Sequence, residues 1–153
     1  MEASEIKQPV KQTATKSSVL AAVVALIGLA DSAYLTAKHF NGTKVPCSIV
    51  SGCETVLTSS YAEFYGIPTA AFGVLAYLLA FSLALLTAFG SRGLWNLFGA
   101  LTVIMTAFTL WLIYLQAFVI GAFCQFCLIS AATTITLFTI YVISRLAGAK
   151  ISQ

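Results

Sequence analysis

The sequence predicts an all-α integral membrane protein, a four-transmembrane-helix bundle with a long extracytoplasmic loop that carries a short interfacial helix. Two observations predict this fold class. Of 153 residues, 59% are hydrophobic and only 8% are charged, whereas soluble domains have roughly 25% charged residues. The apolar residues also gather into runs long enough to cross a bilayer, which takes about 20 residues in a helix. The few basic residues behind the net charge of +3 are scattered, which does not indicate nucleic-acid binding.

The first apolar run is expected to be a membrane anchor. Residues 1–18 are polar and rich in Lys, Ser and Thr, and are expected to form a disordered cytoplasmic tail. Residues 19–37 are apolar except for Asp31 and form the first span. A cleaved signal peptide is the other interpretation, but this run is longer than the usual signal core of about 7–15 residues. We therefore expect an uncleaved anchor.

A long polar segment, residues 38–67, follows the first span and contains Cys47 and Cys53. Loops of this length are usually functional or disordered. Within it, residues 54–65 are predicted to form an amphipathic helix that lies flat over the mouth of the bundle and holds Cys53 above Cys124. The side chains expected to face the bilayer or the bundle are Val56, Leu57, Tyr61 and Phe64.

The remaining spans follow from apolar length. Pro68 is suited to the first turn of a second helix, residues 68–89. Residues 93–144 contain no acidic or basic side chain and would measure about 78 Å as one helix, so this run must reverse. The reversal is predicted within residues 118–123, near Gly121, which gives spans at 94–117 and 125–146. The four-helix membrane domain is therefore expected at residues 19–147, and residues 148–153 form a cytoplasmic tail.

Basic residues predict the orientation, because cytoplasmic segments of membrane proteins are enriched in Lys and Arg. Of the eight Lys and Arg residues, only Lys38 and Lys44 would lie outside if the N-terminus is cytoplasmic. The others are Lys7, Lys11, Lys16, Arg92, Arg145 and Lys150. Both termini are then cytoplasmic, and the four cysteines lie on the extracytoplasmic side of the plasma (inner) membrane, where disulfides persist.

The motif Cys124-Gln125-Phe126-Cys127 carries the predicted chemistry. On the first turn of a helix, the positive end of the helix dipole favours thiolate over thiol. The pair Cys47 and Cys53, on the same side of the membrane, could then exchange its disulfide with this pair through a mixed intermediate. Two such pairs in series form a relay.

Other uses of the cysteines are weighed against the relay. A structural zinc site is disfavoured because its cysteine pairs are usually separated by two to four residues, a shorter spacing than that of Cys47 and Cys53, so no metal is expected. Two static disulfides in a non-enzymatic bundle, such as an assembly subunit or small transporter, are the alternative function. Lability of the disulfides distinguishes the two, since a relay exchanges them and a scaffold does not.

The chain resembles the bacterial form of the vitamin K epoxide reductase family. The resemblance covers nearly the whole chain between its tails, and the order of the pairs, wide pair first, differs from that of DsbB-type oxidases. The features that carry it are the stretch from Asp31 to Thr36 at the end of the first helix, the loop pair Cys47 and Cys53, Gly66-Ile67-Pro68, and the motif from Cys124 to Cys127. Many bacterial relatives carry a fused thioredoxin-like domain; this sequence ends at Gln153, so a stand-alone form with a separate partner is expected.

The resemblance implies a quinone-linked disulfide oxidoreductase. Electrons would pass from a thioredoxin-like (DsbA-like) protein to the shuttle pair Cys47 and Cys53, then to Cys124 and Cys127, and finally to a membrane quinone of the ubiquinone or menaquinone (vitamin K) type. Cys124 would exchange with the loop, and Cys127 would face the quinone. The animal enzymes have a tyrosine four residues after the last cysteine, where this chain has Ala131, so activity on the epoxide is not implied.

A quinone ring needs a flat apolar slot near the outer face. The aromatic residues at a suitable depth are Phe72, Tyr77, Tyr114, Phe123 and Phe126. Each could equally serve bundle packing or an interfacial aromatic belt. The sequence therefore offers these side chains as quinone-binding candidates without separating the two roles.

Asp31 is the ionisable residue inside the first span, and an intramembrane carboxylate is a functional candidate. It could relay protons or tune Cys127, with hydrogen bonds to groups such as Ser32 or Thr69. It could also be hydrated at the outer interface, because Lys38 lies only about 10 Å further along the helix.

Overall fold

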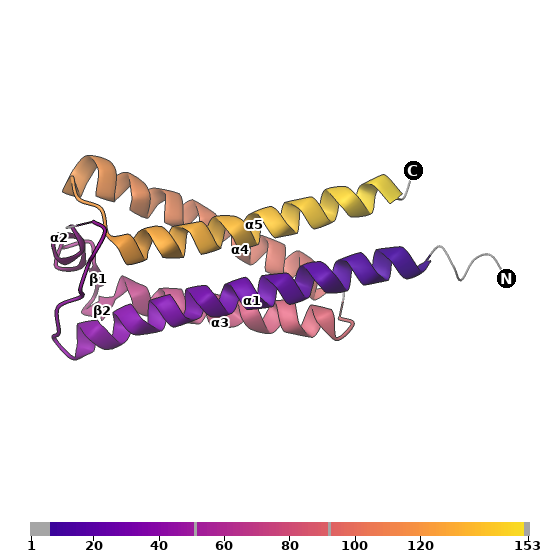
Figure 1. Cartoon of the computed structure of the whole chain (residues 1–153), viewed down its shortest axis with the longest axis horizontal. Helices are drawn as coiled ribbons and strands as arrows, with labels where there is room; N and C mark the ends of the chain where they lie inside the picture. Colours follow the sequence, from indigo (N-terminus) through magenta and orange to yellow (C-terminus); the bar gives the residue numbers. More distant parts are fainter. Residues whose placement is uncertain (1–6, 51, 92, 152–153) are drawn as a thin grey trace.

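In the part of the chain that the structure describes, four long helices run side by side along the long axis of the molecule (Figure 1). The computed structural model describes residues 7–50, 52–91 and 93–151, and only the backbone of residues 7–15 and 149–151. The helices are α1 (Lys7–Phe40), α3 (Thr69–Ala88), α4 (Leu94–Tyr114) and α5 (Gln125–Ile151). Among the described residues, four segments are long and apolar enough to cross a membrane, and they are Lys16–Phe40, Thr69–Ala88, Leu94–Ile120 and Gln125–Gly148. The predicted four-helix membrane bundle is confirmed.

The first helix is longer than the apolar run that predicts it. Since α1 begins at Lys7, residues 7–18 are helical where the sequence predicts a disordered tail, and residues 1–6 lie outside the described residues. Pro9 stands in the first turn of α1, where the missing N–H of proline is tolerated. Lys, Gln and Ala in residues 11–16 have high helix propensity, which favours extension of the helix on the N-terminal side of the apolar run. Arg92, assigned above to the cytoplasmic turn, also lies outside the described residues.

The reversal between the last two spans falls where the sequence predicts it. α4 continues directly into η2 (Leu115–Ile120), a π-helical segment. Such wide turns are uncommon and often occur at functional sites. Gly121 then adopts a left-handed backbone with φ 68°, a conformation that glycine adopts without steric cost. The chain turns there and enters α5 at Gln125.

The outer loop is built differently from the prediction. The helix predicted over residues 54–65 is wrong beyond Leu57, because α2 spans only Cys53–Leu57. The hydroxyls of Thr58 and Ser59 donate to the carbonyls of Glu54 and Val56, and such local bonds compete with helix continuation. The strands β1 (Glu63–Phe64) and β2 (Ile67–Pro68) follow as a small antiparallel hairpin where the sequence predicts helix and loop.

The four apolar side chains that the sequence predicts to face the bilayer or the bundle are not all buried. Val56 is buried and Leu57 is half-buried, as expected for side chains turned toward the bundle. Tyr61 and Phe64 are exposed on the protein. The short helix α2 therefore covers the end of the bundle, and the hairpin of β1 and β2 lies beside it (Figure 1).

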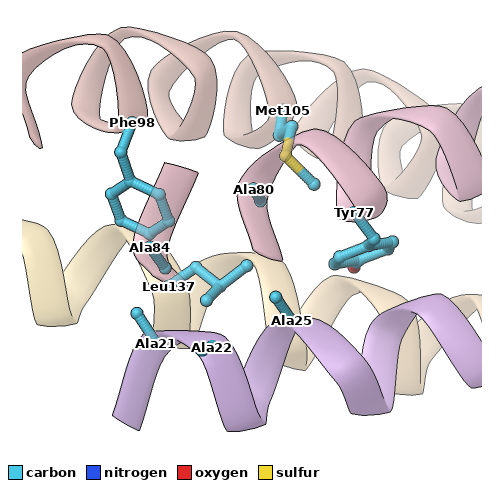
Figure 2. Packing of buried hydrophobic residues seen from close by; sticks show 9 residues of the cluster. All are labelled: Ala21, Ala22, Ala25, Tyr77, Ala80, Ala84, Phe98, Met105 and Leu137. Carbon is cyan, nitrogen blue, oxygen red and sulfur yellow. The ribbon is translucent and has the colours of Figure 1, made fainter. Parts of the chain in front are cut away.

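A tight core holds the half of the bundle away from this loop. α1 packs most extensively against α3, and small side chains permit that approach because they let two backbones come close. Figure 2 shows Ala21, Ala22 and Ala25 of α1 facing the core residues of the other helices. The core residues from those helices are Tyr77, Ala80, Ala84, Phe98, Met105 and Leu137.

Candidate active site

Both cysteine pairs lie at the end of the bundle opposite the first turn of α1 and the last turn of α5 (Figure 1). Cys47 and Cys53 form a disulfide with their Cα atoms 6.2 Å apart, within the range usual for such bonds. Cys124 and Cys127 are free thiols. Cys53 and Cys124 are both 0% exposed and belong to one buried cluster with Val56, and Cys47 and Cys127 are half-buried beside it. The fully buried member of each pair, Cys53 or Cys124, therefore packs in the same cluster.

Gln116 fixes the position of Cys124. This side chain is 4% exposed, and its Oε1 accepts a hydrogen bond from the backbone N–H of Cys124 at 3.0 Å. The backbone carbonyl oxygen of Gln116 accepts a hydrogen bond from the N–H of Ala122 at 3.2 Å. Both ends of Gln116 therefore hold the turn between η2 and α5. Cys124 is thereby set at the start of α5, where its carbonyl accepts from the N–H of Leu128.

The disulfide loop is seated on this turn by two contacts. The N–H of Ile49 donates to Oε1 of Gln125 at 3.1 Å. Gly52 lies so close to the turn that a Cβ there would meet the carbonyl oxygen of Phe123 at 2.7 Å and its nitrogen at 2.9 Å. Only glycine fits this approach, because backbone atoms cannot move aside as a flexible side chain can. The close approach sets Cys53, the next residue, over Cys124.

The surroundings of Cys124 favour its thiolate. A hydrogen bond from the Cys127 thiol, together with backbone hydrogen bonds at Cys127 and Phe126, lowers the pKa of Cys124 to about 7. Burial and the negative charge of Asp31 act in the opposite direction on that pKa. At neutral pH a large share of Cys124 is therefore thiolate, the form that attacks a disulfide.

A cavity of about 640 Å³ lies between the four helices and beneath the outer loop, and Cys127 forms part of its wall. Its volume falls within the range of small-molecule sites, about 300–1,000 Å³. The lining is mostly apolar, and it includes Asp31 and the charged side chains of Lys38, His39, Lys44 and Glu54. The cavity thus connects Cys127 with the apolar interior of the bundle.

The aromatic candidates separate into two groups. Phe72 and Tyr77 line the cavity. Tyr77 is 1% exposed, and its hydroxyl contacts the Ser130 carbonyl at 2.7 Å and the hydroxyls of Thr133 and Thr134 at 2.8 and 2.7 Å. The polar end of Tyr77 therefore joins α3 to α5 while its ring borders the cavity.

The other three aromatic candidates lie elsewhere. Phe123, Phe126 and Tyr114 are not among the described residues that line the cavity. The ring of Phe126 packs against Tyr34 of α1 with centroids 5.3 Å apart. Tyr114 packs against Phe118. Phe126 and Tyr114 therefore join neighbouring elements at this end of the bundle.

Asp31 lines the cavity, and its Oδ2 is buried with no hydrogen-bond partner among the described residues. For this oxygen the expected bond to Ser32 or Thr69 is wrong. The Thr69 hydroxyl instead bonds the carbonyls of Tyr61 and Ala62, at 3.2 and 3.0 Å. Ser32 is buried and faces Gly73 of α3. The carboxylate is left facing the cavity.

Gln116 and Gly52 are site residues that sequence reasoning missed. Gln116 had a signal, because an amide side chain is unusual in a long uncharged apolar run. Gly52 had none, since its role depends on a contact with residues far away in sequence. Within the described part of the chain, no group of three or more His, Cys, Asp or Glu side chains is arranged to hold a metal ion.

Comparison with known proteins adds two findings. A model of the vitamin K epoxide reductase family matches residues 19–142. The chain is also similar to the thiol-disulfide oxidoreductase LTO1 of Arabidopsis thaliana, with 33% identity over 117 residues, which are 71% of this chain. The matched region spans 31% of the length of that relative.

Proposed function

This chain belongs to the vitamin K epoxide reductase family, and on that premise we propose that it is a quinone-dependent thiol oxidoreductase that makes disulfides. The observation that carries the proposal is that Cys53 and Cys124 are buried in the same cluster. The disulfide of the loop therefore packs against the dithiol of α5. Thiol–disulfide exchange needs such contact, because a thiolate must reach the sulfur that it attacks. A scaffold with static disulfides has no use for the free thiols of Cys124 and Cys127.

The loop pair accepts electrons from a protein. A thiolate of a thioredoxin-like partner attacks Cys47, the more accessible member of the disulfide, and Cys53 leaves as thiolate. The second thiol of the partner then displaces Cys47, which leaves the partner oxidised and the loop pair reduced. The partner has gained a disulfide and this chain has gained two electrons.

The inner pair then receives these electrons. When Cys124 and Cys127 are joined, Cys53 attacks Cys124, and Cys47 resolves the mixed disulfide. The product has a Cys47–Cys53 disulfide and two free inner thiols, which is the arrangement of this structure. Gly52 and Gln125 support the exchange because they seat the loop on the turn that carries Cys124.

A membrane quinone is the proposed final acceptor, and the cavity fits it. Cys127 borders an apolar space of about 640 Å³ with Phe72 and Tyr77 in its wall, as a flat apolar ring requires. A quinone bound in this cavity would supply a two-electron acceptor for the thiol of Cys127. When the inner thiols give up two electrons they close into a disulfide, which prepares them for the next exchange with Cys53.

The proposed orientation sets both termini in the cytoplasm and the cysteines on the extracytoplasmic side of the plasma membrane. The described basic residues support it, because Lys16 and Arg145 lie in terminal parts of α1 and α5, at the end opposite the cysteines. Lys38 and Lys44 lie at the cysteine end. A bias of this kind is typical of cytoplasmic segments.

The function is tested with detergent-purified protein, a short-chain ubiquinone or menaquinone analogue, and a reduced thioredoxin-like protein. We expect one quinol for each disulfide formed in the partner, followed by the quinone absorbance and by thiol titration. Cys47→Ala should lose oxidation of the protein partner and retain oxidation of a small dithiol that reaches Cys124 directly. Absence of quinone reduction by the wild-type protein would sink the proposal, and equal loss of both substrates in the variant would overturn the order of the pairs.

A further inference from the structure

The buried oxygen Oδ2 of Asp31 is without a hydrogen-bond partner among the described residues. A buried polar atom without a partner is costly and uncommon in native proteins. Inside a membrane span the cost is greater, and such carboxylates line functional cavities and proton paths. Asp31 lines the cavity that Cys127 also borders. The unpartnered oxygen therefore indicates a group that the cavity receives during the reaction.

Asp31 lies at the level of the inner thiols. The Tyr34 and Phe126 rings pack with centroids 5.3 Å apart, which joins the outer part of α1 to the first turn of α5. Asp31 precedes Tyr34 by about one helical turn, or about 4.5 Å along the axis, and Cys127 directly follows Phe126. The charge of Asp31 also acts on Cys124. The carboxylate and the Cys127 sulfur therefore border the same cavity, and the carboxylate is near enough to Cys124 for its charge to act there.

The charged neighbours that could neutralise Asp31 are engaged elsewhere. Lys44 pairs with Glu54 at 3.0 Å, and His39 pairs with Glu63 at 3.3 Å. Lys38 lies over the Tyr34 ring, with Nζ 5.6 Å from the ring centroid. Among the described residues, no ion pair includes Asp31. A structural salt bridge therefore does not account for a carboxylate at this position.

We propose that Asp31 carries a proton between the Cys127 thiol and an oxygen of the quinone in this cavity. This inference rests on the proposed function. Oδ2 takes the proton from the Cys127 sulfur, and Asp31 passes it to one ring oxygen. Two electrons pass from the two sulfurs to the ring as the Cys124 thiolate and the Cys127 sulfur join in the S–S bond. The proton that Cys124 released on becoming thiolate reaches the second ring oxygen through water. Two thiols and one quinone thus give one disulfide and one quinol, with no further reactant.

Single-turnover kinetics test this role. Protein with reduced Cys124 and Cys127 is freed of reductant and mixed with a short-chain ubiquinone analogue in a stopped-flow instrument. Asp31→Asn should slow quinol formation by about 100-fold or more, the contribution typical of one proton-transfer group. Formate or azide, small enough to enter the cavity, should restore part of the lost rate. The matched control is Glu63→Gln, because Glu63 is a carboxylate at the same end of the molecule that is exposed, pairs with His39 and is not among the described residues that line the cavity, and it should react at the wild-type rate.

Infrared difference spectra supply a second readout that does not depend on turnover or on the Asn variant folding. Oxidation of the inner thiols in quinone-free protein should change a carboxyl band, and Asp31→Glu should shift that band. An unchanged rate in Asp31→Asn, a lost rate that small acids do not restore, or a carboxyl band that Asp31→Glu does not shift would each overturn the role of Asp31. A wild-type protein that does not reduce quinone would instead refute the function on which it rests.

Discussion

The two ends of the bundle are built for different purposes. At the end away from the cysteines, Trp95 stacks on Phe98 with centroids 4.6 Å apart and donates to Ser144 at 2.9 Å, and Tyr141 covers Gly99. At the cysteine end the helices separate around a cavity, a disulfide loop caps them, and a carboxylate oxygen of Asp31 has no partner among the described residues.

This difference shows how one small membrane domain combines rigidity with chemistry. Close packing at one end fixes the relative positions of the helices, because packed interiors have few alternative arrangements. The other end can then keep costly features, including an open cavity and a buried thiol with a shifted pKa. Substitutions at the packed end should therefore change stability, and substitutions at the cysteine end should change electron transfer.

The largest contrast is expected within α5. Cys127→Ala should reduce quinone reduction to the background rate, because no second thiol remains to close the inner disulfide. Leu137→Ala, further along the same helix and fully buried, should lower the free energy of unfolding by about 2 kcal/mol or more and leave the rate per folded molecule unchanged. Quinone absorbance and thermal unfolding in detergent measure the two effects. A strong loss of rate per folded molecule in Leu137→Ala would contradict the separate roles of the two ends.

An alanine in place of a glycine at each end gives a smaller and more specific contrast. Gly52→Ala places a Cβ against the Phe123 backbone and lifts the loop, so oxidation of the protein partner should slow on the order of 10- to 100-fold. Small dithiols should still be oxidised. Gly99→Ala meets the Tyr141 ring and should instead cost about 1–3 kcal/mol in stability. Equal slowing of partner and small-dithiol oxidation by Gly52→Ala would contradict the seating role of Gly52.

The smallest effect concerns the titration of Cys124. In reduced, quinone-free protein, iodoacetamide should modify Cys124 with a pH midpoint of about 7, with faster reaction above it as the thiolate forms. Cys127→Ala removes the hydrogen bond that lowers this pKa most, so the midpoint should rise toward the ordinary cysteine value. Modification at pH 7 should then slow roughly tenfold. Mass spectrometry of the Cys124 peptide measures this rate, and an unmoved midpoint would show that Cys127 does not donate to Cys124.

Much of the fold could be predicted from the sequence because apolar length and glycine position are local properties. The spans and the reversal at Gly121 follow from them. The end of α2 at Leu57 could not be predicted, since it depends on whether the hydroxyls of Thr58 and Ser59 bond back to the helix. A sequence pattern does not decide between that bond and one to water.

The site was predictable where chemistry depends on residue type, and not where it depends on contact. The four cysteines are identifiable as candidates from their spacing and from the predicted topology, which groups them at one end of the bundle. The division of the aromatic candidates, with Phe72 and Tyr77 at the cavity and Phe126 against Tyr34, depends on helix rotation, which apolar residues on every face leave undefined. The contact of Gly52 with Phe123 likewise joins segments that only the fold brings together.

The central claim, that the two pairs act in series through Cys53 and Cys124, is tested most directly by trapping that bond. In the double variant Cys47→Ser, Cys127→Ser only Cys53 and Cys124 remain, and mild oxidation should join them, as seen by mass spectrometry of non-reduced peptides. The matched control Cys53→Ser, Cys124→Ser keeps Cys47 and Cys127 and should form its disulfide far more slowly. Rapid and complete formation of the Cys53–Cys124 disulfide supports the relay. Free thiols at both positions under the same oxidation, or equally fast bonding in the control, would contradict it.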